Sequence, residues 1–104
     1  MGKAVGIIEV YGLAAVFGAV DAGCKAANVT VETLDKNKPG NADALPVPLI
    51  VAIKFRGTVE DVKAAVEAAE AAAKATTGVI CKHIIANVED STEKMLKLKA
   101  FDKK

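Results

Sequence analysis

The feature that most constrains this chain is an order of elements that occurs twice. In each half, an apolar extended run leads through a helix rich in small residues to a second extended run. Two such units in tandem predict the order βαββαβ, an α+β, ferredoxin-like antiparallel sheet with two helices on one face. The other face and both edges of the sheet are then available for neighbours. The predicted elements span residues 3–10, 12–28 and 29–35, then residues 49–57, 58–77 and 78–86.

The composition suits a single small packing unit. A chain of 104 residues can form one domain with a core of its own. Hydrophobic residues make up 52% and aromatic residues only 4%, so the core must consist of Ala, Val, Ile and Leu. The 14 basic and 13 acidic residues are spread along the chain, which argues against a nucleic-acid partner. The N-terminus lacks a signal-peptide pattern and no apolar run reaches spanning length, so we expect a cytoplasmic protein with no membrane partner.

The two helices differ in their patterns. Apolar residues of the first helix recur every three or four positions and predict a stripe that faces the core: Leu13, Val16, Phe17, Val20, Cys24 and Ala27. The opposite side of this helix carries only small residues: Ala14, Ala15, Gly18, Ala19 and Ala22. Small side chains would let another backbone or subunit approach closely. The alternative is that the alanines serve helix propensity alone, although this does not explain Gly18. We expect Asn28 to end this helix in the left-handed conformation. Thr58 and Asp61 have the spacing of a capping box at the start of the second helix, whose stripe is Val62, Ala65, Val66, Ala69, Ala72 and Ala73.

An extended loop separates the halves. Residues 36–48 contain all three prolines of the chain together with Gly40, and Pro39-Gly40 has turn chemistry. A hairpin connection normally takes two to five residues, so this length indicates a function. Residues 90–104 form a C-terminal helix and a basic tail, with Asp90 and Ser91 as the expected caps.

No arrangement of residues predicts catalysis. His83 is the sole histidine, and Cys81 is the only other potential metal ligand on the same face of its predicted strand. Two ligands do not hold a zinc ion, so we expect no metal site. Cys24 fits a small core residue better than a nucleophile. Nucleotide-binding loops, nucleophile elbows and zinc-protease motifs are all absent from the sequence. We therefore expect no enzyme activity, no catalytic residues and no cofactor.

Two stretches resemble the bacterial microcompartment shell proteins that carry the hexamer-forming BMC domain. The first is Gly6-Ile-Ile-Glu-Val-Tyr-Gly-Leu13 with the following residues 19–29, and the second is Phe55-Arg-Gly-Thr-Val-Glu-Asp-Val-Lys-Ala-Ala65 with residues 78–85. The resemblance covers nearly the whole chain. It implies a structural subunit that forms a homo-hexamer and tiles with other shell proteins into the wall of a cytoplasmic compartment, where encapsulated enzymes are further candidate partners.

The resemblance also implies site residues. The loop after the second strand would line a central pore for small metabolites, with these candidates: Lys36, Asn37, Lys38, Pro39, Gly40 and Asn41. The interface candidates are Lys25, Asn28 and Asn87, and Lys25 matches the lysine at the hexamer edge. Six copies of Lys36 and Lys38, partly offset by Asp35 and Asp43, would form a positive ring that attracts anions. The alternative is that these lysines point to bulk water and the loop narrows the opening.

The chain departs from the family pattern in two places. Ala86-Asn-Val-Glu89 stands where typical members carry a Pro-Arg-Pro-His-like segment, so the arginine of the lateral contact is absent. The extended loop is similar to that of the variant shell proteins of glycyl-radical microcompartments. Some relatives bind an iron–sulfur cluster through a pore cysteine, but residues 36–48 contain no cysteine, so we expect no cluster.

Two other functions fit a fold of this kind. A ferredoxin-like regulatory module would bind a small ligand between the subunits of a dimer or trimer. A small acyl-phosphate hydrolase would need an arginine and an asparagine near the first loop, and residues 9–13 contain neither.

Overall fold

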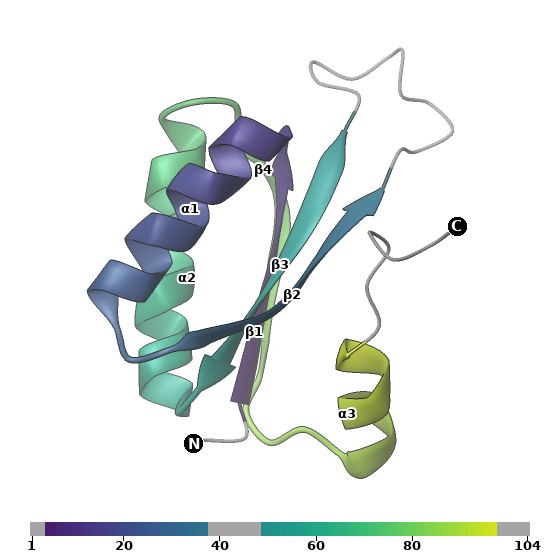
Figure 1. The fold of residues 1–104 in the computed structure, drawn as a ribbon. Coiled ribbons are helices and arrows are strands. Elements are labelled where there is room, and N and C mark those ends of the chain that lie inside the picture. Colours follow the sequence, from purple (N-terminus) through teal and green to yellow (C-terminus); the bar gives the residue numbers. More distant parts are fainter. Residues whose placement is uncertain (1–3, 38–48, 98–104) are drawn as a thin grey trace.

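The computed structural model describes residues 4–37 and 49–97. Its elements follow the predicted order, including the short C-terminal helix (Figure 1): β1 (Ala4–Tyr11), α1 (Leu13–Ala26), β2 (Thr30–Asn37), β3 (Ile50–Gly57), α2 (Val59–Lys74), β4 (Val79–Ile85) and α3 (Asp90–Leu96). The strands pair in the order β2-β3-β1-β4, and every pair is antiparallel. The predicted α+β, ferredoxin-like βαββαβ fold is therefore confirmed.

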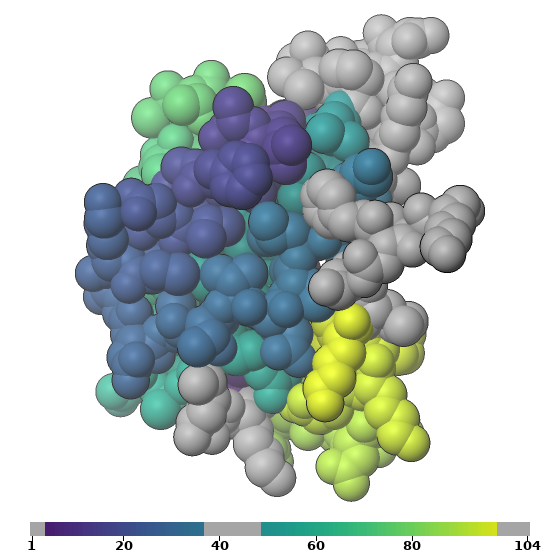
Figure 2. Space-filling view, in the orientation of Figure 1, coloured from purple at the N-terminus to yellow at the C-terminus, as the bar shows by residue number. Residues whose placement is uncertain are grey.

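The sheet has two different faces. Helices α1 and α2 cover one face, and α3 lies on the other, as Figure 1 shows. In the space-filling view of Figure 2, α1 in purple and blue and α3 in yellow likewise lie on different sides of the molecule. Side chains alternate along a strand, so β1 directs Ile8 and Val10 into the helical layer, and β3 directs Ile53 and Phe55 there. These four side chains are fully buried. Each contributes about 1.5–3 kcal/mol relative to an exposed position.

The packing of α1 corrects the expected orientation of this helix. Its buried residues are Ala15, Val16, Ala19 and Gly23, which are mostly the small ones, whereas Phe17 is 60% exposed. A Cβ at Gly23 would lie 2.6 Å from Phe55 Cζ and 3.1 Å from the carbonyl oxygen of Ala65 on α2. The two helices approach so closely that only a small-residue face fits between them. The prediction that Leu13, Phe17 and Cys24 face the core was wrong for this reason.

The second helix matches its prediction. Val62, Ala65, Val66, Ala69 and Ala73 are buried, and Ala72 is half-buried. The side-chain oxygen of Thr58 accepts a hydrogen bond from the backbone N–H of Asp61, 3.1 Å away, as a capping box requires. Gly78 follows the helix with a φ of 137°, a conformation that favours glycine.

The end of α1 differs from the prediction. Helix α1 ends at Ala26, and Ala27 follows in an extended conformation. Among the residues that the structure describes, only glycines have positive φ, so Asn28 does not form the left-handed cap that we expected.

Helix α3 packs on the second face of the sheet through a small cluster. Val5, Val88 and Leu96 are buried there, with Ile7 and Ile85 partly buried around them. The helix begins at Asp90, and its N-cap is Glu89 rather than the expected Asp90 or Ser91; the Glu89 carboxylate accepts a hydrogen bond from the backbone N–H of Ser91. No helix in the described ranges is long and apolar enough to cross a membrane.

Candidate functional site

Two of the expected pore residues, Lys36 and Asn37, lie at one end of the sheet, where they belong to β2 rather than to the loop that was expected to begin at residue 36. Asn37, the last residue of β2, pairs with Ile50, the first residue of β3, so both strands open onto residues 38–48 at this end. Lys36 is exposed on β2. Lys38, Pro39, Gly40 and Asn41, with most of the extended loop, fall outside the described residues.

The expected interface residues gather at the opposite end of the strands. Lys25 lies in the last turn of α1 and Asn28 just after it, and both are exposed. A Cβ at Gly57, the final residue of β3, would lie 3.1 Å from the carbonyl oxygen of Asn28. Asn87 is exposed after the end of β4, whose Ile85 pairs with Val5 near the start of β1. An eight-residue strand spans about 24 Å, so the two groups of candidates are separated by nearly the length of the sheet.

Lys25 forms an exposed ion pair within its own helix. Its ammonium nitrogen lies 2.8 Å from Asp21 Oδ2, one turn earlier. The hydrogen bond to Asp21 raises the pKa of Lys25 above its usual value, so its charge is secure at neutral pH. Exposed pairs of this kind contribute little to stability. The lysine can therefore exchange Asp21 for another acceptor at small cost.

Asp35, next to Lys36 on β2, does not share the environment of that lysine. Its Oδ2 lies 2.5 Å from Lys54 Nζ on β3, on the face that α3 covers, and Lys54 is 7% exposed. Lys54 Nζ also donates a 3.0 Å hydrogen bond to the carbonyl oxygen of Leu96, which accepts another from Thr33 Oγ1 at 3.2 Å. A buried ammonium needs such partners because its desolvation is otherwise too costly. Asp35 is thus shared with Lys54, and its expected partial offset of the Lys36 charge stays a prediction.

A second ion pair anchors α3 to the same strand. The guanidinium of Arg56, which is 9% exposed, bonds to the carboxylate of Glu93 on α3. Its Nη1 is buried without a hydrogen-bond partner among the described residues. The sequence holds a signal for both pairs, because Lys54 and Arg56 occupy alternate positions in an otherwise apolar strand. The acidic partners follow only from the strand register and from the position of α3.

The cysteines and His83 form no metal centre in the described part of the chain. The thiol of Cys81 donates a hydrogen bond to Glu9 Oε1, 2.9 Å away on the neighbouring strand, and this contact raises the pKa of Cys81. His83 is exposed on β4, and Cys24 is exposed on α1 rather than buried as expected.

Comparison with known proteins decides the family. Residues 4–88 match the model of the BMC domain. The chain belongs to the BMC-domain family. Its relatives include the carboxysome shell protein CcmK2 of Synechococcus elongatus, which is 37% identical over 92% of this chain and 87% of its own length. The bacterial microcompartment shell protein PduA of Citrobacter freundii is 35% identical over 90% of this chain and 91% of its own.

Solved structures support the same fold. A microcompartment protein from Desulfitobacterium hafniense superposes with a TM-score of 0.70 over 93% of this BMC-domain chain, at 24% sequence identity. This chain spans 48% of the length of that protein. The resemblance to BMC-domain shell proteins is confirmed, and with it the role of a structural shell subunit located in a microcompartment shell in the bacterial cytoplasm. A regulatory ligand-binding module is not favoured, and the likeness to glycyl-radical variants stays a prediction.

Proposed function

We propose that six copies of this chain close into a ring around a central pore, and that the ring tiles with other shell proteins. The observation that carries this proposal is the separation of the two candidate groups along the strands. Lys36 and Asn37 lie where β2 and β3 open onto the extended loop, whereas Lys25, Asn28 and Asn87 lie at the other end. A subunit of a ring needs such polarity, with one end at the axis and the other at the perimeter.

We further propose that the pore favours small anions. Lys36 is exposed at the axial end, and the carboxylate of the adjacent Asp35 is paired with Lys54 on the other face of the sheet. Six copies of Lys36 would raise the positive potential at the opening, and Asp35, which is shared with Lys54, would offset only part of it. The chain would act by selective passage rather than by catalysis, with encapsulated enzymes as partners on one side of the wall.

The ring is tested by the mass of the purified protein. Native mass spectrometry and light scattering should give six chains per particle, and electron microscopy should show a ring with a central opening. A monomer at high concentration would contradict the proposal.

The pore is tested by single-channel recording in a planar bilayer with a salt gradient. The parent should show a reversal potential that favours anions, and the Lys36→Ala, Lys38→Ala double variant should lose this preference. Lys94→Ala removes an exposed lysine of α3 and is the control for a general change of charge; this variant should keep the preference for anions. An unchanged preference in the double variant would exclude the lysine ring.

A further inference from the structure

Large hydrophobic side chains are exposed on two opposite boundaries of the fold. Leu13 and Phe17 are 39% and 60% exposed on α1, and Ile80 is 38% exposed on β4. Helix α2 packs against α1 on one side and against β4 on the other, and β4 is an edge strand. The exposed apolar groups therefore mark the two sides of the molecule rather than one continuous patch.

The first boundary carries an apolar ridge, formed by Leu13, Phe17, Val20 and Cys24 on α1. Val20 is half-buried and the other three are exposed, at the spacing that normally forms a core-facing stripe. From Leu13 to Val20 the helix carries no charge. An aromatic ring at this exposure in a chain with few aromatic residues indicates a surface that another molecule covers.

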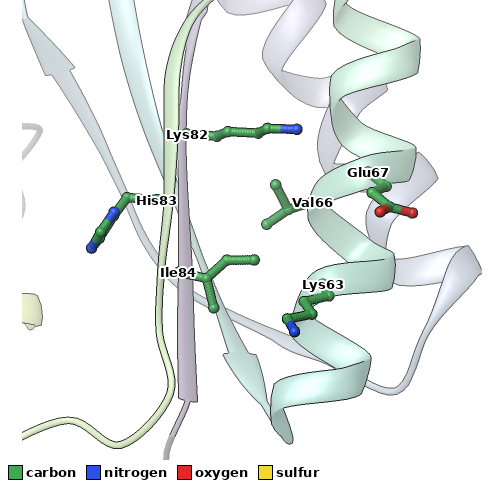
Figure 3. Close-up of a pocket in the computed structure, with 6 residues that line it drawn as sticks. All are labelled: Lys63, Val66, Glu67, Lys82, His83 and Ile84. Atoms are coloured by element: carbon green, nitrogen blue, oxygen red, sulfur yellow. The ribbon is translucent and has the colours of Figure 1, made fainter.

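The second boundary carries a hollow between α2 and β4, with a volume of about 360 Å³. Figure 3 shows Val66 of α2 and Ile84 of β4 turned toward each other inside it, while Lys82 extends from β4 toward α2. Lys82 Nζ lies 2.7 Å from Oε1 of Glu70 on α2, so this ion pair joins the strand to the helix. Lys63, at the rim, forms no ion pair within residues 4–37 and 49–97. The hollow thus offers an apolar floor and one unpaired cation.

We propose that the apolar ridge of one copy seats in the α2–β4 hollow of the next copy. This inference rests on the proposed ring and specifies its subunit contact. A ring of identical chains needs two different, complementary surfaces on opposite sides of each subunit, whereas a contact of ridge with ridge would close a dimer and leave the hollow empty. Phe17 supplies the apolar group that matches the floor of the hollow. Asp21, exposed one turn after Phe17, supplies a carboxylate for Lys63.

The contact is tested by breaking each surface in a separate chain. Phe17→Asp removes the ridge, and Lys63→Trp places a bulky ring over the hollow. Because both positions are exposed, each variant should keep the far-ultraviolet circular dichroism and the melting behaviour of a folded subunit. In light scattering, each variant alone should lose the ring: the protein concentration at which the ring dissociates should be at least tenfold higher than for the parent. An equimolar mixture should form a dimer, because it restores one intact ridge and one intact hollow.

Controls separate this inference from the proposed function. Met95→Asp changes a 67% exposed hydrophobic residue on α3, away from both surfaces, and should leave the ring intact, as should Phe17→Leu. If the parent forms a ring and either Phe17→Asp or Lys63→Trp retains it, the ridge–hollow contact is wrong while the ring stands. If the mixture fails to associate, the pairing of these two surfaces is wrong. A monomeric parent would overturn the ring itself.

Discussion

Lys54 and Asp35 join the two strands that lead to the extended loop, with 2.5 Å between Nζ and Oδ2. The pair lies on the face of the sheet that α3 covers, and Lys54 also bonds to the last carbonyl of that helix. One ammonium group therefore connects β2, β3 and α3. This arrangement fixes the end of β2, next to Lys36, against β3 and α3.

Removal of one member of this pair should destabilise the fold. Asp35→Ala leaves the buried ammonium of Lys54 with fewer partners, and we expect a loss of about 2 kcal/mol, below the range for a fully buried pair because Asp35 is 25% exposed. The Lys54→Met, Asp35→Asn double variant should recover most of that loss, since no unpaired charge is then buried. Thermal unfolding at one fixed protein concentration measures both effects. Asp21→Ala is the control, because its exposed pair with Lys25 should contribute less than about 0.5 kcal/mol.

Two glycines of α1 should respond in opposite directions to alanine. Gly23→Ala places a Cβ 2.6 Å from Phe55 Cζ, so it should destabilise the protein by about 1–3 kcal/mol through overpacking. Gly18 has no heavy atom within 4 Å of the added Cβ, so Gly18→Ala should stabilise the helix by about 0.5–1 kcal/mol. Melting temperatures of the two variants measure this difference. Equal effects would contradict the close approach of α1 to Phe55.

The two cysteines should differ in their reaction with iodoacetamide. The contact with Glu9 raises the pKa of Cys81, so at mildly alkaline pH fewer Cys81 thiols are ionised than without that carboxylate. Glu9→Gln should therefore increase the alkylation rate of Cys81 several-fold, as followed by peptide mass spectrometry. The rate at Cys24, on the distant α1, is the internal reference and should stay the same. A Cys81 rate that does not respond to Glu9→Gln would show that the carboxylate has no influence on the thiol.

Acid should weaken the attachment of α2 to β4. The hydrogen bond from Lys82 lowers the pKa of Glu70 below its usual value of 4.5, and Lys74 adds to the effect. Because the folded-state pKa is the lower one, the stabilisation is present above the unfolded-state pKa and is lost as the pH falls through the folded-state pKa. At about pH 6 the Glu70→Gln variant should therefore be less stable than the parent, and this difference in stability should shrink as the pH falls to about 3. Melting curves across this range give the comparison, and a constant difference would contradict it.

Lateral tiling should improve when the missing arginine is supplied. Asn87 is exposed after β4, at the end of the strands where Lys25 also lies. Asn87→Arg adds a planar donor that can bond to carbonyl groups of an adjacent ring. We expect electron micrographs of the variant to show larger and flatter sheets than those of the parent. Asn87→Lys is the control for charge alone and should have a smaller effect.

Much of the fold could be predicted from local signals. Helix α2 followed from its capping box and its apolar period, and the strands followed from apolar runs bounded by glycine and proline. These signals depend on neighbours in the sequence, so one chain suffices to reveal them. The end of β2 did not follow, because the strand continues through Lys36 and Asn37, which were expected in the loop but pair with Val51 and Ile50.

The orientation of α1 and the partners of Lys54 could not be predicted in the same way. Hydrophobic periodicity identifies a stripe but contains no information about the distance between helices, and at this distance the face with Gly23 fits while the face with Phe17 does not. The pairing of Lys54 with Asp35 depends on the strand register, which shifts within β2 between Val31 and Thr33. Both features arise from contacts between segments that are far apart in the chain.

The carbonyl oxygen of Leu96 accepts hydrogen bonds from two strands and thereby sets a boundary for protein engineering. A tag or cargo protein fused after residue 97 keeps that oxygen in place, whereas a deletion that begins inside α3 leaves Thr33 and Lys54 without it. A deletion that reaches α3 would consequently alter both strands that lead to the proposed channel, although it touches no residue of that channel.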